Sequence, residues 1–195
     1  MKKRTAVIGA LVSLLPMGQP LVIGTGAALT STALILAVPK QAQAESEDFY
    51  FQRGNNRIEE GDNYGAISDF EKVLKLNPNN YAALHNIGLV KGQKLGDIKG
   101  AIVDFNKAIV INPEYSDAFF NRGVAKLFLK DNYGAISDLL KALETDSQNP
   151  QRKTILWNLG LAKSRIGDMK GACYEMRKAS SLGEEDAPKW VKKNC

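Results

Sequence analysis

Two short phrases recur four times along this chain, always in the same order. A Gly-Ala pair stands at residues 65–66, 100–101, 134–135 and 171–172, so successive copies lie 35, 34 and 37 residues apart. A second glycine precedes each copy, at residues 54, 88, 123 and 160, within the phrases QRGN, NIGL, NRGV and NLGL. Two phrases that keep one register over such a period indicate a supersecondary unit repeated four times.

Each repeat contains two stretches with the apolar spacing of an amphipathic helix. In the first copy, Tyr50, Gly54 and Ile58 share one helical face, and a second helix is expected over residues 64–76. Asn77-Pro78 ends that helix, because proline cannot continue it. We interpret the repeated glycines as places where the two helices approach each other. The facing small positions are expected to be Ala66, Ala101, Ala135 and Ala172.

The full pattern is an aromatic residue and a glycine four residues on, then Gly-Asp, Ala-x3-Phe, Ala and Asn-Pro. It resembles the tetratricopeptide repeat over residues 47 to about 186. The second unit has one extra residue, the third lacks the final proline, and Met176 replaces the second-helix aromatic of the fourth. The resemblance implies an all-α, right-handed α-solenoid of about four helix-turn-helix units. We place these units at residues 47–80, 81–115, 116–149 and 153–186 of a domain covering 45–195.

A solenoid needs a last helix over the open end of its core. We assign this cap to residues 187–195, with Trp190 and Val191 buried and the neighbouring lysines in water. The alternative is a frayed tail. Cys173 occupies the place of an isoleucine in the earlier units, and Cys195 ends the cap. In an oxidising compartment they are expected to form a disulfide that pins the cap; otherwise Cys173 is a buried cysteine and Cys195 is incidental.

Residues 1–44 differ from the rest of the chain. Met1-Lys-Lys-Arg4 opens it, no charge follows until Lys40, and Ala42-Gln-Ala44 precedes an acidic stretch. This is the pattern of a secretory signal cleaved after Ala44. The alternative is a membrane anchor within residues 5–38, which contain 18 uncharged residues from Leu21 to Val38. Both interpretations place the repeats outside the cytoplasm, in a periplasm or, in a photosynthetic source, a thylakoid lumen. Contact with a membrane is expected only through an uncleaved segment.

The remaining composition argues against several classes of function. The formal charge of +5 includes four basic residues and no acids from the first 44, which leaves 22 basic and 21 acidic residues after them. That balance gives no support for nucleic-acid binding. His85 is the single histidine and is expected to lie on the surface or in a groove, with no sequence neighbour that would complete a triad or metal site. We therefore predict no catalytic residue, no metal, no cofactor and no enzyme activity.

The resemblance also implies where a partner would bind, since tetratricopeptide arrays usually line a concave groove with their first helices. The matching inward positions are Phe51, His85, Phe120 and Trp157, then Gln52, Asn86, Asn121 and Asn158, and one turn onward Asn55. A row of asparagine amides offers donors and acceptors to an extended peptide backbone. The alternative is that these asparagines tie each helix to adjacent turns. Family members that bind acidic C-termini of cytosolic chaperones use lysine and arginine where this chain has Phe51, Ala82, Asp117 and Asn121, so that activity is not expected.

The function expected from sequence is thus non-enzymatic. It is an exported protein that binds a peptide or protein segment in its groove, as a scaffold or assembly factor for an envelope or membrane complex. The alternative is a structural protein that associates with itself, which a terminal cap should oppose by blocking end-to-end growth.

Overall fold

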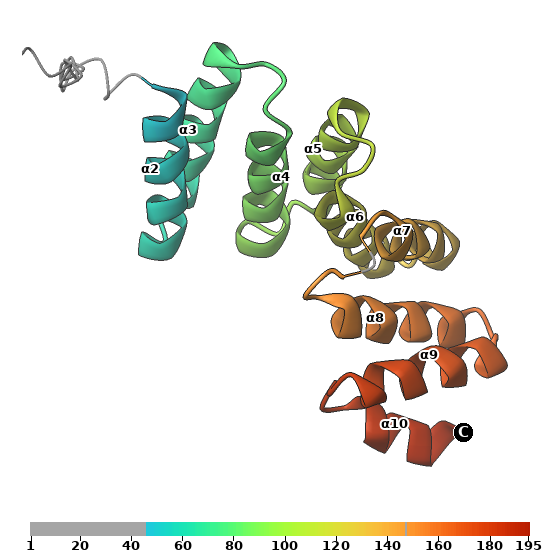
Figure 1. The fold of residues 1–195 in the computed structure, drawn as a ribbon. Helices are drawn as coiled ribbons and strands as arrows, with labels where there is room; N and C mark the ends of the chain where they lie inside the picture. Colours follow the sequence, from blue (N-terminus) through green and yellow to red (C-terminus); the bar gives the residue numbers. More distant parts are fainter. Residues whose placement is uncertain (1–45, 147) are drawn as a thin grey trace, which may run out of the picture. The chain divides into compact units, whose positions relative to one another are not determined.

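The repeated phrases fold into helix pairs that follow one another in chain order (Figure 1). The computed structural model describes residues 46–146 and 148–195, and the predicted signal or anchor at residues 1–44 lies outside them. The first helices are α2 (Glu47–Glu60), α4 (Tyr81–Leu89) continued by the π-helix η1 (Val90–Lys94), α6 (Ser116–Phe128) and α8 (Arg152–Arg165). The second helices are α3 (Asn63–Leu76), α5 (Ile98–Ile111), α7 (Asn132–Thr145) and α9 (Met169–Ser181), and α10 (Ala187–Asn194) follows them. The predicted all-α solenoid is confirmed.

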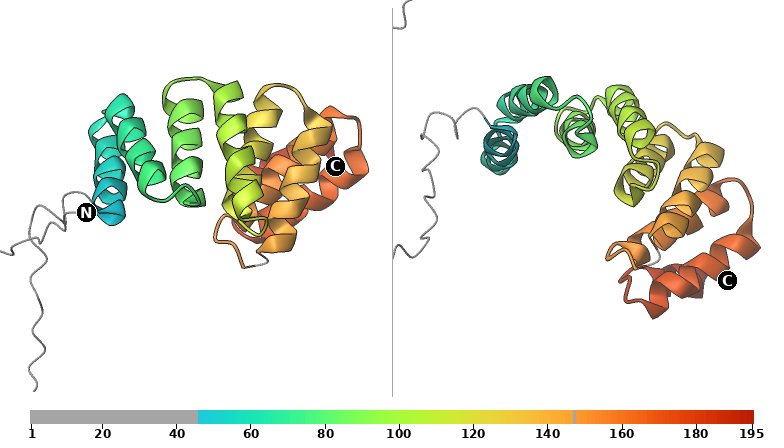
Figure 2. Two further views of the ribbon diagram at one scale, coloured as in Figure 1. Left: turned by 90° about the horizontal axis from the view of Figure 1, so that it is seen from above. Right: turned by 45° about the horizontal axis from the view of Figure 1, so that its top comes forward.

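Each second helix packs against the first helix of its own unit, and α3, α5 and α7 also pack against the first helix of the next unit (Figure 2). The first helices α4, α6 and α8 therefore each lie against two second helices. Such a helix buries two of its faces, and only the remaining face is open to solvent or to a partner. This arrangement decides which of the predicted groove residues are accessible.

The turn between the helices of a unit explains the glycine of each Gly-Ala pair. Asp62, Asp97, Asp131 and Asp168 precede the second helices, and each carboxylate accepts a hydrogen bond of 2.9 Å from the backbone N–H of the glycine three residues on. A side chain on that glycine would collide with the capping carboxylate. An aspartate at this position bonds a backbone N–H group that has no partner within the helix. Its negative charge also interacts favourably with the positive N-terminal end of the helix dipole.

The other repeated glycine faces a large side chain rather than an alanine, which corrects the sequence-based expectation. A Cβ added to Gly54 or Gly88 would lie 2.8 Å from the ring of Phe70 or 2.6 Å from that of Phe105. In the later units the same place meets Leu139 and Met176. Because the second helix contributes the large side chain to the helix crossing, the first helix must contribute the space.

The extra residue of the second unit is accommodated by the π-helix η1. The repeated glycine and the next Gly-Ala pair are 12 residues apart here, at residues 88 and 100, and 11 apart in the other three units. Residues 90–94 form the wider turn between these two points. Single π-turns absorb one inserted residue without breaking the helix, and they often occur at functional sites.

Every unit also buries an acidic side chain on its second helix beside a basic one on its first. The pairs are Arg57–Asp69 at 2.9 Å, Lys91–Asp104 at 2.6 Å, Lys126–Asp138 at 2.8 Å and Lys163–Glu175 at 2.7 Å. Asp69 and Asp138 each accept two further bonds, from Arg53 and Arg122 respectively. The bonds from Arg53 hold the pKa of Asp69 below its ordinary value. A repeated buried charge pair fixes how the two helices face each other.

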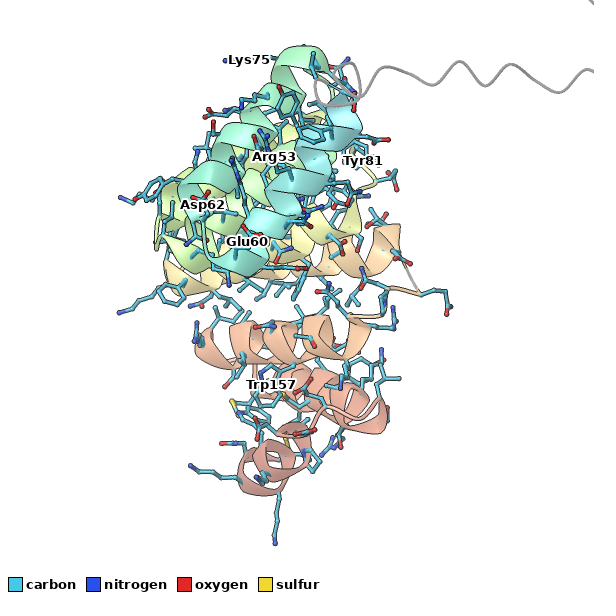
Figure 3. The ribbon with its side chains drawn as sticks, turned by 90° about the vertical axis from the view of Figure 1, so that its left-hand side faces the viewer. Arg53, Glu60, Asp62, Lys75, Tyr81 and Trp157 are labelled. Carbon is cyan, nitrogen blue, oxygen red and sulfur yellow. A yellow bond between two sulfur atoms is a disulfide. The ribbon has the colours of Figure 1, made fainter. Side chains whose placement is uncertain are left out.

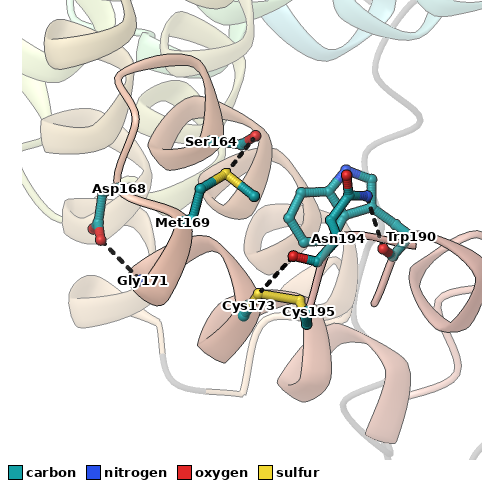
Figure 4. The surroundings of a disulfide bond; sticks show 8 residues. All are labelled: Ser164, Asp168, Met169, Gly171, Cys173, Trp190, Asn194 and Cys195. Carbon is teal, nitrogen blue, oxygen red and sulfur yellow. Dashed lines mark hydrogen bonds between the residues drawn. A yellow bond between two sulfur atoms is a disulfide. The ribbon is translucent and has the colours of Figure 1, made fainter. Parts of the chain in front are cut away.

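The C-terminal residues form helix α10, which packs on α9. Ala187 is fully buried, whereas Trp190 and Val191 are only half-buried, so the expected burial of the tryptophan is incomplete. Cys173 of α9 and Cys195 lie at disulfide distance, with sulfur atoms 2.08 Å apart (Figure 4). A bond between them would tie the end of α10 to the second helix of the last unit.

Candidate functional site

A pocket of about 440 Å³ opens on the first-helix side, between η1 and α6. We call it the groove pocket. One wall consists of Leu89, Gly92 and Gln93, and the opposite wall carries Asn121, Val124 and Phe128. Its floor includes Ala101 and Phe105 of α5, between the two first helices. Most of these side chains are apolar, and a carboxamide on each wall is the polar part. Such a lining is typical of a site for an apolar group of a ligand.

The groove pocket exists because of a glycine at the π-turn. Gly92 stands four residues after the repeated glycine, where the other units carry Ile58, Leu127 and Ser164. A Cβ on Gly92 would lie 3.2 Å from the Cβ of Ala101, closer than most side chains pack. The missing side chain and the wider helical turn therefore leave space that the other units fill.

Asn121 is the predicted groove residue that the structure places in this pocket. Its Nδ2 donates to Nε2 of His85 at 2.9 Å and to the carbonyl oxygen of Asp117 at 2.9 Å. Within residues 46–146 and 148–195, no hydrogen bond reaches its Oδ1. The Nδ2 group thus holds the amide in place, and Oδ1 is left to accept a hydrogen bond from a peptide N–H of a ligand.

His85 is buried beneath Asn121, so the expectation of a surface or groove histidine is wrong. Only 6% of the residue is exposed, and its ring lies against Phe105 and Tyr115. The Tyr115 hydroxyl is 3.3 Å from Nδ1, on the other side of the ring from Asn121. Nε2 lies 2.9 Å from Nδ2 of Asn121, so polar groups flank both nitrogens of the neutral ring. Burial lowers the pKa of His85 and favours this neutral form.

The predicted aromatic row contributes less open surface than the sequence indicates. Phe120 is buried in the core between the third and fourth units, which corrects its expected place in the groove. Phe51 is half-buried against the ring of Phe70, with centroids 5.6 Å apart, and Trp157 is half-buried beside Leu156 and Ala187 (Figure 3). The position three residues before the repeated glycine turns toward the neighbouring second helix, and packing between units covers it.

The predicted asparagines use their donor groups inside the solenoid, as the structural alternative expects. Asn86 donates to Oδ1 of Asn55 across two units at 3.2 Å, and Asn158 donates to the carbonyl oxygen of Thr154 at 2.8 Å. Among the described residues, no hydrogen bond reaches Oδ1 of Asn158. Asn121 and Asn158 therefore keep acceptors for a ligand, while their donors bond within the first helices. Gln52 is exposed at the first unit.

Sequence reasoning missed the most exposed aromatic residue of this face. Phe128 is 76% exposed at the end of α6 and lines the groove pocket. The sequence signal for it was a phenylalanine directly after Leu127, the last residue of the apolar helical pattern, and just before the turn. Large exposed aromatic side chains beside a pocket are frequent anchors of protein interfaces.

Two features are absent from the part of the chain that the structure describes. There, no cluster of histidine, cysteine, aspartate or glutamate has the arrangement of a metal site. No helix of this part of the chain combines the length and the hydropathy required to cross a bilayer.

The comparisons with known proteins agree with the helical repeats. A model described as tetratricopeptide repeat matches residues 47–80, and one described as TPR repeat matches residues 93–127. Among curated proteins, no significant sequence match was found.

Solved structures are similar over most of the described chain. A crystal structure of MamA protein is 26% identical, with a TM-score of 0.67, and the match covers 76% of this chain and 80% of that one. PilF of Pseudomonas aeruginosa is 24% identical, with a TM-score of 0.65 and coverage of 72% and 63%. The first TPR of Spaghetti (RPAP3), bound to the HSP90 peptide SRMEEVD, is 22% identical, with a TM-score of 0.58 and coverage of 64% and 95%. Identities this low in the last two show the fold alone. Residues 47–80 and 93–127 thus match tetratricopeptide-repeat models, and the described chain has the all-helical solenoid fold of these neighbours.

Proposed function

We propose that this chain is an exported, non-enzymatic protein that binds a segment of another protein along its first helices. It would serve as a scaffold or assembly factor for an envelope or membrane complex. The observation that carries this proposal is the groove pocket, which combines apolar walls, an exposed Phe128 and a free acceptor on Asn121. The structure of a protein with this fold in complex with an HSP90 peptide supports a peptide ligand in general.

Export rests on the sequence of residues 1–44 and on the cysteine pair. A basic start, an uncharged stretch and Ala42-Gln-Ala44 favour cleavage after Ala44. A disulfide between Cys173 and Cys195 would persist in an oxidising compartment. Fractionation of the native host, with mass spectrometry of the mature N-terminus, tests this part separately. A chain that retains Met1 in a membrane fraction would favour the anchor, and one found in the cytoplasm would refute export.

Site-specific photocrosslinking tests binding along the first helices. Benzoylphenylalanine replaces Phe128 in one variant and Tyr133 in a control; the two side chains are 76% and 74% exposed, and only Phe128 lines the groove pocket. We expect irradiated cells to give a discrete adduct from position 128 and none from position 133, with the partner identified by peptide mass spectrometry. The same adduct from both positions, or adducts from position 133 alone, would refute the proposal. An adduct with a second copy of this chain would favour self-association instead.

A further inference from the structure

Phe128 separates the groove pocket from a second hollow one unit further along. This hollow has a volume of about 520 Å³ and is lined by Leu127, Phe128, Lys130, Asn132 and Arg165. We call it the basic hollow. One exposed aromatic ring thus contributes to two neighbouring cavities, so a single extended ligand can occupy both sides of it.

The basic hollow carries positive charge without an acidic partner. Lys130 and Arg165 are both exposed, and neither forms an ion pair with any residue in 46–146 or 148–195. Arg165 is held in place by the bond from its Nη1 to the carbonyl oxygen of Leu127, at 3.1 Å. Most other groups around it are apolar or neutral. An anionic side chain is therefore the complementary occupant.

Lys130 occupies its place at an energetic cost. It follows the end of α6 with φ of 63°, and the other three units have Gly61, Gly96 and Gly167 at the equivalent turn, with φ between 72° and 85°. Left-handed backbone disfavours a residue with a side chain, and such strain is often found at functional sites. Of these four turns, the one with lysine borders a hollow that contains a second basic residue. A role of Lys130 in binding explains why this turn keeps a strained lysine.

The groove pocket adds a requirement for an apolar group. Its volume of about 440 Å³ suits one large side chain, and Leu89, Val124 and Phe128 supply the apolar contact. Asn121 presents an acceptor at the same wall, where a peptide N–H of the ligand can bond. Charge on one side of Phe128 and apolar surface on the other define an ordered pattern in the ligand.

We propose that the bound segment carries a large apolar side chain close in sequence to an acidic side chain. The apolar group fills the groove pocket against Phe128, and the carboxylate pairs with Lys130 and Arg165 in the basic hollow. This inference rests on the proposed function and adds the chemistry of the partner. The carboxylate is that of a side chain within the segment, so a free C-terminus is not needed.

A peptide array tests this pattern with purified residues 45–195. The array presents a Gly-Ser background in which leucine, phenylalanine or methionine stands one to five residues from aspartate or glutamate, with matched peptides that carry lysine instead. We expect binding to acidic–apolar peptides, equal for free and amidated C-termini, and none to the lysine set. The selected peptide is then titrated by fluorescence anisotropy at low and high salt.

Two charge-matched double variants identify the site. Lys130→Gln with Arg165→Gln removes the basic hollow's charge, whereas Lys75→Gln with Lys99→Gln removes the same charge from exposed sites on second helices. We expect the Lys130/Arg165 variant to weaken binding about tenfold at low salt, which is the size of effect expected from the loss of two exposed ion pairs, and less at high salt because salt screens them. The Lys75/Lys99 variant should leave Kd unchanged. Phe128→Ala should weaken binding at both salt concentrations, and Tyr133→Ala should not.

The outcomes separate this inference from the proposed function. Equal losses from both double variants, binding that requires a free carboxylate, or preference for the lysine peptides would overturn the inference. If position 128 still crosslinks a partner in cells while the array shows no acidic–apolar binding, the proposed function stands and the inference fails. If sedimentation shows a dimer that Phe128→Ala dissociates, the occupant is a second copy and the inference also fails.

Discussion

Replacing Lys130 with glycine should stabilise the fold, although it removes a charged side chain from the surface. The residue has φ of 63° at the end of α6, where the other units have glycine. A left-handed backbone costs a residue with a side chain roughly 1–2 kcal/mol. A change to glycine also lowers the free energy of unfolding by about 0.4–1 kcal/mol, because glycine gives the unfolded chain more conformational freedom. We therefore expect Lys130→Gly to raise the free energy of unfolding by about 0.5–1 kcal/mol.

The reverse substitution provides the matched control. Gly61 has φ of 82°, and a Cβ added there would meet no atom within 4 Å, so Gly61→Lys changes backbone strain without a steric clash. It should lower the free energy of unfolding by a similar amount. Urea denaturation followed by circular dichroism measures both, and the expected shift in Tm is about 1–4 °C for a domain of this size. A destabilised Lys130→Gly variant, or a neutral Gly61→Lys variant, would refute the account of strain at this turn.

Three further predictions concern the interior. Gly88→Ala should lower the free energy of unfolding by about 1–2 kcal/mol, because the added methyl group would lie 2.6 Å from the fixed ring of Phe105. Gly160→Ala should be nearly neutral, because the flexible end of Met176, at 2.9 Å, can move. Chemical denaturation of the two variants measures both changes, and equal losses would contradict the prediction. His85 has a lowered pKa, so the unfolded chain binds a proton before the folded one as pH falls through 6.5, and the free energy of unfolding should decrease. The loss between pH 7.5 and 5.5 should be larger than in His85→Gln, and parallel pH profiles of the urea midpoints would exclude the buried neutral ring. Asp138→Asn leaves Arg122 and its neighbouring lysine without their buried partner and should cost about 2–4 kcal/mol, with an unchanged denaturation midpoint as the contrary result.

The repeat register was sufficient to predict the fold and the pairing of helices. Periodicity places apolar residues on one face of each helix, and proline and glycine mark its ends, so both signals are local. The buried charge pairs had a sequence signal as well. A basic residue three places after each repeated glycine, and an acidic one three places after each alanine, occur in all four units, as with Lys126 and Asp138. Sequence reasoning did not connect them because they lie on different helices.

Only the tertiary structure decided which first-helix residues are open to a partner. The sequence assigns His85 and Phe120 to the same helical position as Trp157, but packing covers the first two. His85 lies against the rings of Phe105 and Tyr115, and Phe120 lies in the core between the third and fourth units. The groove pocket depends on an inserted residue that the chain absorbs as a π-turn at Gly92, and the sequence shows the insertion without showing where it is accommodated. Local pattern determines each helix, because its hydrogen bonds join near neighbours. Exposure and cavities depend on how three helices meet, which no single stretch of sequence contains.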